Sequence, residues 1–225
     1  MHDTLDNLIR IEKEIQLKVK QSNLIIKEPK IIAVSKNFMM PHILPLITHG
    51  HIDFGENRVS DLQRKSSELK KLCPEIRWHM IGNLQSKKIK SLLNVENLYA
   101  VHSIYDKKHL DLFNQYTKTP LRIFFQINSS KEVQKGGVAT YGQILELINM
   151  INNECLIFEG LMGMGKLEGN EEDLYKSFLE LKAFSNQLTN EFKRNVKTSM
   201  GMSGDFEIAI KAGSNFIRVG SAIFK

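Results

Sequence analysis

The sequence predicts an α/β fold in which eight parallel strands close into a barrel and helices cover its outside. Runs of Ile, Val, Leu and Phe alternate with amphipathic segments along the whole chain, and they form about eight strand-then-helix units. Eight units close a parallel barrel, and 225 residues lie near the lower end of its usual length. The runs contain few polar residues, which is typical of strands buried on both faces. An open doubly wound sheet is the main alternative.

The predicted elements follow one another without repeats or linkers. The segment 4–22 is amphipathic, so we expect an additional N-terminal helix on the outside of the barrel. Pro41 suits the first turn of the next helix, and Gly50 ends it. The expected strands are 31–36, 52–54, 76–81, 98–102, 121–127, 156–161, 196–199 and 216–220. The expected helices after the first are 41–48, 59–72, a short one around 89–93, 106–116, 141–151, 171–192 and 205–212.

The composition predicts one globular domain, 1–225, because 42% of the residues are hydrophobic and 25% are charged. The first residues lack the basic start and apolar run of a signal peptide. No stretch approaches the ~20 apolar residues of a membrane-spanning helix, so we expect a cytoplasmic protein without a membrane partner. Cys73 and Cys155 belong to no metal-spaced pattern, and we expect reduced thiols and no metal site.

The first predicted strand is an apolar run that ends on Lys36. Ligands bind at the carboxyl ends of parallel strands in α/β folds, and we expect a lysine there to be partly shielded from water. Desolvation would lower its pKa and make the free amine available for a Schiff base with an aldehyde or ketone. The alternative is a strand-terminal lysine whose ammonium reaches solvent.

Two segments rich in glycine and serine follow the seventh and eighth predicted strands. Segment 199–204 reads Ser-Met-Gly-Met-Ser-Gly and opens a short helix, and segment 218–221 reads Arg-Val-Gly-Ser. Parallel barrels often bind a phosphate between these two loops, where glycines let backbone N–H groups approach an anion and serines add donors. Either segment alone is explained by a turn of the chain, but the two together favour a phosphate site.

The formal net charge of +6 would suit a phosphorylated ligand or a nucleic acid. The lysines are scattered, however, and segments such as 65–71 and 87–90 contain no interleaved aromatic residues of the kind that stack on single-stranded nucleic acid. We therefore interpret these segments as solvated helix faces and expect no nucleic-acid partner.

Short motifs occur in order and at compatible spacing along nearly the whole chain. They are 33–36 (AVSK), 54–57 (FGEN), 78–87 (WHMIGNLQSK), 160–162 (GLM), 199–205 (SMGMSGD), 213–214 (GS) and 218–220 (RVG). This set resembles the pyridoxal phosphate homeostasis proteins, which are single-domain relatives of the alanine racemase barrel. The resemblance implies a (β/α)8 barrel of the TIM type, like the alanine racemase N-terminal domain, and pyridoxal 5′-phosphate (PLP) bound covalently to Lys36 as an aldimine.

The resemblance also implies roles for other residues. The implied cofactor-binding residues besides Lys36 are Asn57, His79, Met162, Ser199, Gly201, Ser203, Arg218, Gly220 and Ser221. The three serines and Gly220 would surround the phosphate, and Arg218 would face the pyridine nitrogen or the phosphate end. An arginine cannot readily protonate that nitrogen, so the cofactor would be a weak electron sink.

Two of these assignments have a structural alternative. Asn57 and His79 would flank the cofactor ring, although a hydrogen-bonded core histidine is an equal alternative for His79. Met162 would contact the ring or fill the core.

The function implied by the resemblance is intracellular PLP homeostasis, in which the protein stores the cofactor and delivers it to apo PLP-dependent enzymes. We expect a monomer. We also expect no established catalytic activity, because the chain stops just past the eighth predicted strand, without the domain that supplies a tyrosine base in alanine racemases. A weak PLP-dependent amino-acid racemase or another Schiff-base enzyme, such as an aldolase, is the alternative.

The sequence departs from the family pattern in three places. Loop 162–166 lacks the usual proline, Arg58 replaces a frequent aromatic residue and Asn215 replaces a usual threonine. We expect these changes to affect loop rigidity and phosphate contacts. Lys135 and Gly137 match a loop motif without an assigned role.

Overall fold

The computed structural model describes residues 3–21, 28–128, 136–165 and 170–225. Its strands are β1 (Lys30–Val34), β2 (Asp53–Glu56), β3 (Arg77–Met80), β4 (Leu98–Ile104), β5 (Leu121–Ile127), β6 (Leu156–Gly163), β7 (Lys197–Met202) and β8 (Phe216–Val219). Its helices are α1 (Thr4–Gln21), α2 (Met40–Thr48), α3 (Val59–Leu69), the 3₁₀ turn η1 (Ser86–Lys88), α4 (Ile89–Leu93), α5 (Lys107–Tyr116), α6 (Tyr141–Asn149), α7 (Glu171–Phe192), α8 (Phe206–Lys211) and α9 (Ser221–Phe224).

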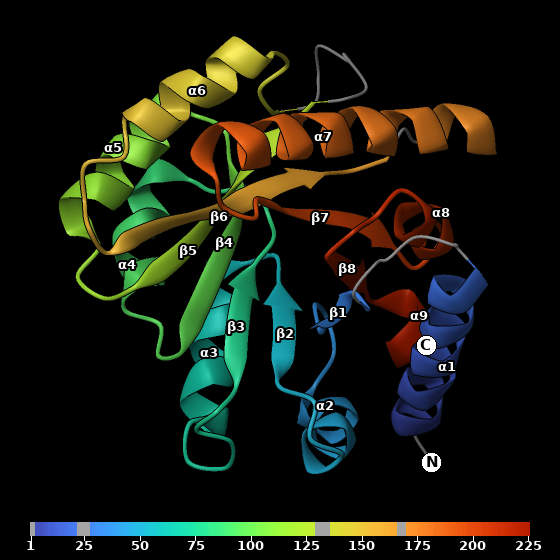
Figure 1. Ribbon diagram of the computed structural model, residues 1–225. Helices are drawn as coiled ribbons and strands as arrows, with labels where there is room; N and C mark the ends of the chain where they lie inside the picture. The colour runs from blue at the N-terminus through green and yellow to red at the C-terminus, as the bar shows by residue number, and fades with distance from the viewer. Residues whose placement is uncertain (1–2, 22–27, 129–135, 166–169) are drawn as a thin grey trace.

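The eight strands form a closed barrel in the order in which they follow along the chain (Figure 1). β1 pairs in parallel with both β2 and β8, which closes the ring. The predicted barrel is therefore confirmed, and the open sheet is wrong. Because all strands run in the same direction, their carboxyl ends meet at one mouth of the barrel.

Side chains of alternate strand residues divide the core into an inner and an outer part. Ile31 and Ala33 belong to the large core between strands and helices, whereas Ile32 lies in a small apolar cluster inside the barrel. The other buried members of the inner cluster are Ala100, Phe124, Met162 and Phe216. Even-numbered residues of β1 therefore face the barrel axis.

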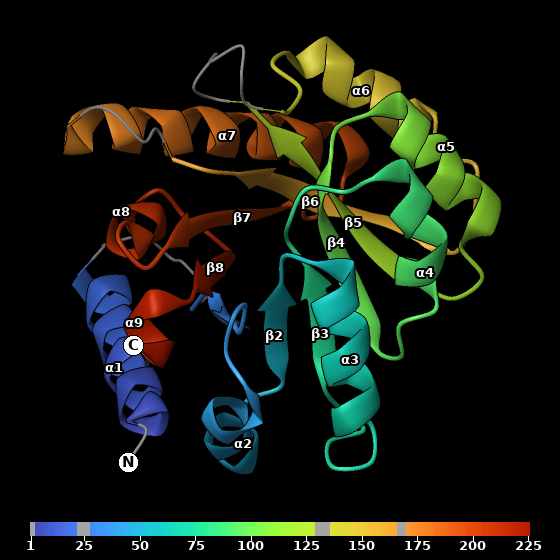
Figure 2. The same cartoon turned by 180° about the vertical axis from the view of Figure 1, so that it is seen from behind.

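Helix α1 lies on the outside, as predicted, and buries Leu8, Ile11 and Ile15. Both views of the molecule show it beside α9 (Figures 1 and 2). The side-chain amide of Asn7 donates a hydrogen bond to the Ile223 carbonyl at 3.1 Å. The first and last helices of the described chain thus pack together next to β1 and β8.

Strand β7 is longer than predicted. It runs to Met202, so that Met200, Gly201 and Met202, which we expected in the loop after the strand 196–199, are strand residues. The register between β7 and β8 shifts between Ser199 and Met202, and Gly201 has a positive φ of 96° there. This irregularity keeps β7 paired with β8 past the point where the glycine suggested a turn.

None of the helices in the described ranges is both long and apolar enough to cross a lipid bilayer.

Candidate functional site

Lys36 lies at the mouth formed by the carboxyl ends of the strands, two residues beyond the end of β1. Ile32 of β1 faces the inside of the barrel, but the strand ends before Lys36, so the alternation of side chains does not extend to it. Its side chain is exposed, so the partial shielding that we expected is wrong. The physical reason is that the strand stops at Val34 and the chain turns, with the Phe38 N–H bonded to the Ser35 carbonyl at 3.0 Å.

A buried ion pair lies directly beneath this turn. The Lys65 ammonium of α3 donates to Glu56 Oε1 of β2 at 2.5 Å and to the Ser35 carbonyl at 2.6 Å. The Ser35 hydroxyl donates to the same carboxylate oxygen at 2.7 Å. Lys65 is 1% exposed and Glu56 is 0% exposed, so our interpretation of segment 65–71 as a solvated face is wrong for Lys65. Both partners of the pair are hydrogen-bonded to Ser35, the residue that precedes Lys36.

The turn after Lys36 packs against the last helix. The Phe38 ring stacks on the Phe224 ring of α9, with centroids 4.9 Å apart. The Ser203 hydroxyl, just past β7, accepts hydrogen bonds from the Gly220 N–H at 3.1 Å and the Ala222 N–H at 3.3 Å. The structure therefore brings together the Lys36 turn and the two loops that follow β7 and β8.

Arg218 lies inside the barrel at this end and is held by two other strands. Its NH1 group donates to the Ser199 carbonyl at 2.7 Å and to the Ser199 hydroxyl at 2.9 Å. Its NH2 group donates to the carbonyl of Gly163, the last residue of β6, at 2.9 Å. Burial lowers the pKa of Arg218 to about 10, against the attraction of Asp205, so the guanidinium stays charged at neutral pH.

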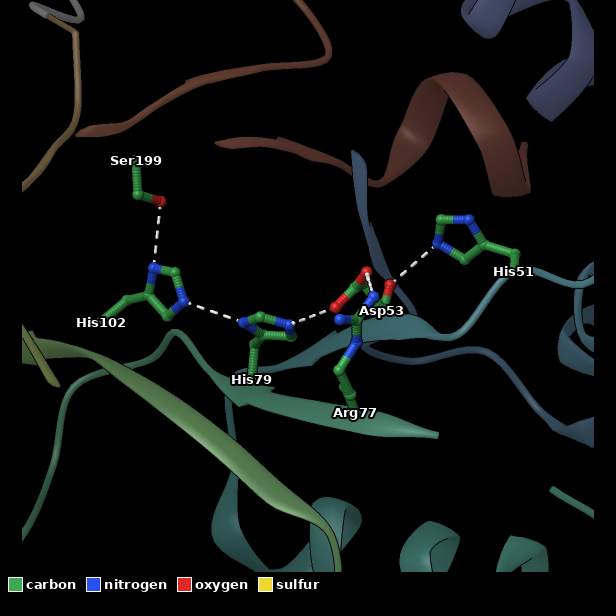
Figure 3. Close-up of polar contacts among 6 residues, drawn as sticks. All are labelled: His51, Asp53, Arg77, His79, His102 and Ser199. Carbon is green, nitrogen blue, oxygen red and sulfur yellow. Dashed lines mark hydrogen bonds and ion pairs between the residues drawn. The ribbon is translucent and has the colours of Figure 1, made fainter. Parts of the chain in front are cut away.

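A row of buried polar side chains continues from Ser199 across the barrel (Figure 3). His102 Nδ1 lies 3.0 Å from the Ser199 hydroxyl, and His102 Nε2 lies 3.0 Å from His79 Nδ1. His79 Nε2 lies 3.0 Å from Asp53 Oδ1, and the other carboxylate oxygen accepts from Arg77 NH2 at 2.6 Å. The row links β2, β3, β4 and β7, and Ser199 connects it to Arg218 on β8.

Burial controls the charge of this row. It lowers the pKa of His79, partly opposed by Asp53. It also lowers the pKa of His102 well below the usual value, assisted by repulsion from His79 when that ring is protonated and from Arg218. Burial alone would raise the pKa of Asp53, but the hydrogen bond from His79 and the charge of Arg77 outweigh it, and the net shift is downward. At neutral pH the row therefore consists of two neutral imidazoles and one carboxylate.

The structure places the predicted site residues in two groups. Lys36, Ser203, Gly220 and Ser221 lie at the mouth, and Ser221 is exposed. Ser199, His79 and Met162 are buried within the barrel wall or interior. His79 is the hydrogen-bonded core histidine of the alternative, because both of its ring nitrogens are engaged. Met162 packs in the inner apolar cluster, as core filler does.

Asn57 and Gly201 are two further predicted cofactor-binding residues. Asn57 Oδ1 is buried and has no hydrogen-bond partner among the described residues, so it is an available acceptor, but atoms away from the site such as Trp78 Nε1 and Thr117 Oγ1 share this property. A Cβ on Gly201 would come within 2.6 Å of the Ala209 Cβ, so this glycine accommodates helix α8.

Asn215 lies away from the site, and some other positions singled out in the sequence lie outside the described residues. Asn215 lies before β8, at the opposite end from the mouth, where its side chain accepts from the Thr198 N–H at 2.8 Å. Its expected effect on phosphate contacts is therefore wrong. Gly137 is described, but Lys135 and part of loop 162–166 lie outside the described residues.

Sequence reasoning missed four residues around the site: Asp53, Glu56, Lys65 and His102. Glu56 lies within the FGEN motif, and His102 ends a predicted strand, but neither position indicates its partner. The partners are 9 residues apart for Glu56 and Lys65 and 97 residues apart for His102 and Ser199. Only the folded barrel brings the second pair together.

Residues 13–225 match the family described as alanine racemase, N-terminal domain. A pyridoxal phosphate homeostasis protein of Caenorhabditis elegans is 36% identical over 211 residues, which cover 88% of this chain and 86% of that protein. One of Schizosaccharomyces pombe is 34% identical over 229 residues, which cover 100% and 92%. The structure of PipY from Synechococcus elongatus PCC7942 with PLP bound has a TM-score of 0.81 at 24% identity and covers 99% of this chain and 100% of PipY.

Proposed function

This chain belongs to the family of pyridoxal phosphate homeostasis proteins, and from this premise we propose that it binds PLP covalently through the Lys36 Nζ atom. When bound, PLP supplies an aldehyde that forms a Schiff base with an amine. The observation that carries the proposal is the packing at the mouth. The Lys36 turn contacts α9 through the stacked Phe38 and Phe224 rings, and Ser203 ties the β7 loop to the start of α9. An accessible amine and two glycine- and serine-rich loops therefore share one end of the barrel.

The residues at this end suit the parts of PLP. Ser203, Gly220 and Ser221 would hold the phosphate. The Ser203 hydroxyl accepts hydrogen bonds from two backbone N–H groups, and it would have to release them if these groups donated to a phosphate oxygen instead. Within the described part of the chain, Arg218 makes three hydrogen bonds with a group that has five N–H donors, so it could also donate to a ligand. The unpaired Asn57 Oδ1 offers an acceptor. For Ser199 we propose an indirect role, because its hydroxyl already contacts Arg218 and His102.

We propose storage and delivery of PLP within the cell as the function, with apo PLP-dependent enzymes as recipients. Racemisation needs a base on each face of the substrate carbon. His79 is not positioned as the second base, because it is 0% exposed and bonded through both ring nitrogens. A monomeric state and a cytoplasmic location remain predictions from the sequence.

The test is the visible absorption of the purified protein mixed with PLP. We expect a yellow protein, loss of the colour in Lys36→Ala, and retention of the colour in Lys87→Ala, which removes another exposed lysine after the next strand but one. Borohydride reduction, which makes the linkage permanent, followed by peptide mass mapping should locate the cofactor on Lys36. A cofactor mapped to a different lysine would overturn the assignment.

The same assay tests the phosphate site. Charge-assisted hydrogen bonds contribute about 1.5–3 kcal/mol each, so pyridoxal without its phosphate should bind at least about tenfold more weakly than PLP. Equal affinities would refute the role of the loops around Ser203 and Gly220.

A further inference from the structure

The buried row from Asp53 to Arg218 has a donor-only group at one end and an acceptor-only group at the other. Arg218 is a guanidinium that can only donate hydrogen bonds, and Asp53 is a carboxylate that can only accept them. Between them lie two imidazoles and one hydroxyl, each of which both donates and accepts when neutral. Such a chain has few proton arrangements that satisfy every contact.

The Asp53 carboxylate determines which ring nitrogen of His79 and of His102 carries the proton. Since the carboxylate accepts, His79 must carry its proton on Nε2, and its Nδ1 atom is then an acceptor. His102 must therefore carry its proton on Nε2 to donate to His79, which leaves His102 Nδ1 as an acceptor for the Ser199 hydroxyl. The reverse order would place the lone pair of His79 Nε2 against the carboxylate.

The Arg218 end is compatible with the same order, although a hydroxyl oxygen with two lone pairs does not require it. The NH1 group of Arg218 donates to Ser199 Oγ, so the oxygen accepts there and its own proton is free for His102 Nδ1. The order set at Asp53 and the Arg218 contact thus fit one direction of donation, from Arg218 to Ser199, His102, His79 and finally Asp53. Figure 3 shows the members of this row from Ser199 to Asp53. His102 lies between His79 and Ser199 in this row. Through His102, the proton order that Asp53 sets at His79 determines where the Ser199 hydroxyl donates.

We propose that His102 is a positioning residue, which orients the Ser199 hydroxyl and thereby holds the Arg218 guanidinium in place at the mouth of the barrel. The ligand part of this inference rests on the proposed binding of PLP, whereas the proton order does not. Among the described residues, the groups that face His102 are His79 from β3, Ser199 from β7, Arg218 and the Phe216 ring from β8, and the Phe124 ring from β5. Those that face His79 besides His102 and Asp53 are Arg77, the charge of Lys30 and the Tyr99 and Phe216 rings.

Packing alone is the competing explanation for His102. Its ring stacks on Phe124 with centroids 4.2 Å apart and an interplanar angle of 10°. A merely structural role would be served by any flat ring at this position. The positioning role requires instead a hydrogen-bond acceptor where the Nδ1 atom lies.

The first experiment measures the proton order directly on the full-length wild-type protein. Long-range ¹H–¹⁵N NMR of histidine-labelled protein at pH 7.5 distinguishes protonated imidazole from its two neutral tautomers. The spectra of His79→Gln and His102→Asn assign the signals among the 7 histidines of the chain. We expect both His79 and His102 to be neutral with the proton on Nε2. A proton on Nδ1 of either ring, or an imidazolium, would overturn the proposed order.

The second experiment compares two substitutions that separate positioning from packing. His102→Phe keeps a ring to stack on Phe124 but removes the acceptor for Ser199. His102→Asn loses the ring but places an amide oxygen near the position of Nδ1. If His102 positions Arg218, His102→Phe should weaken the PLP affinity by about tenfold, and His102→Asn should recover most of that loss although its thermal stability is lower.

The opposite ranking, in which His102→Phe binds PLP better than His102→Asn, would show a packing role and overturn the proposal, and equal losses in both variants would do the same. If the wild-type protein binds no PLP at all, the proposed function fails, but the NMR experiment still decides the proton order.

Discussion

At the scale of single residues, Lys65 shows how a charged side chain can be part of the interior. Lys65 and Glu56 are almost completely buried, and the ammonium also holds the Ser35 carbonyl. The two buried charges attract each other and the Ser35 hydroxyl adds a hydrogen bond to Glu56 Oε1, whereas Glu56 Oε2 has no partner among the described residues. Removing one partner leaves the other as an unpaired buried charge.

We therefore expect Lys65→Met to lower the free energy of unfolding by about 3–5 kcal/mol, because it leaves the Glu56 carboxylate uncompensated. Urea denaturation monitored by circular dichroism measures this. Arg64→Met is the matched control: the neighbouring residue on α3 forms an exposed pair with Glu68, and its loss should cost no more than about 0.5 kcal/mol.

The double variant Lys65→Met with Glu56→Gln separates charge from packing. It should be less destabilised than the sum of the two single variants, since no unpaired charge remains. Similar costs for Lys65→Met and Arg64→Met would show that the buried pair does not stabilise the fold.

At the scale of elements, the irregularity in β7 sets where the strand presents its polar side chains. Ser199 aligns with Phe216 and Met202 aligns with Arg218, so three steps along β7 match two along β8. Gly201 has a positive φ within the shift, a conformation that strains residues with a Cβ. The extra residue lets Ser199 contact Arg218 inside the barrel while Ser203 reaches Gly220 at the mouth.

Gly201→Ala should destabilise the protein by about 1–3 kcal/mol, because a Cβ there combines the strained φ with a contact of 2.6 Å to Ala209. Chemical denaturation checks the value. Gly204→Ala in the following turn is the control, since its Cβ would meet nothing within 4 Å, and it should change the stability by less than about 0.5 kcal/mol. Equal effects of the two substitutions would contradict the strain argument.

At the scale of the whole molecule, the buried histidines couple folding to pH. Burial lowers the folded-state pKa of His51, His79 and His102 below the usual 6.5. Between that value and the folded pKa values, the unfolded chain binds more protons than the folded one. The free energy of unfolding should therefore be nearly constant above pH 6.5 and fall as the pH decreases below it.

We expect a slope of up to about 1.4 kcal/mol per pH unit for each histidine, or about 4 kcal/mol per pH unit for all three together. Urea unfolding between pH 8 and pH 4.5 measures it. His102→Asn removes one of the three histidines and should reduce the slope by up to about 1.4 kcal/mol per pH unit. The lowered pKa of Asp53 adds a further loss of stability only below about pH 4. A protein equally stable at pH 7.5 and pH 5 would contradict this prediction.

Much of the fold and the location of the site could be predicted because they depend on local patterns. Apolar runs and amphipathic periods depend on residues a few positions apart, and their number and order imply the closed barrel. Lys36, Ser203 and Gly220 follow predicted strands, which places them at the mouth formed by the carboxyl ends. The motif resemblance added the expected cofactor. Boundaries were predicted less well, as in β7, where pairing with β8 outweighed the local turn preference of Gly201.

Local sequence patterns are thus sufficient to predict the alternation of strands and helices and the end of the barrel at which Lys36 lies. The exposure of Lys36, the burial of Lys65 and the hydrogen-bonded row that joins His79 to His102 become evident only in the folded barrel. The physical reason is that burial and partner choice depend on residues brought together by barrel closure, such as Ser199 and His102 from β7 and β4. A side chain's chemistry can be read from the chain, but its surroundings are created when the strands meet.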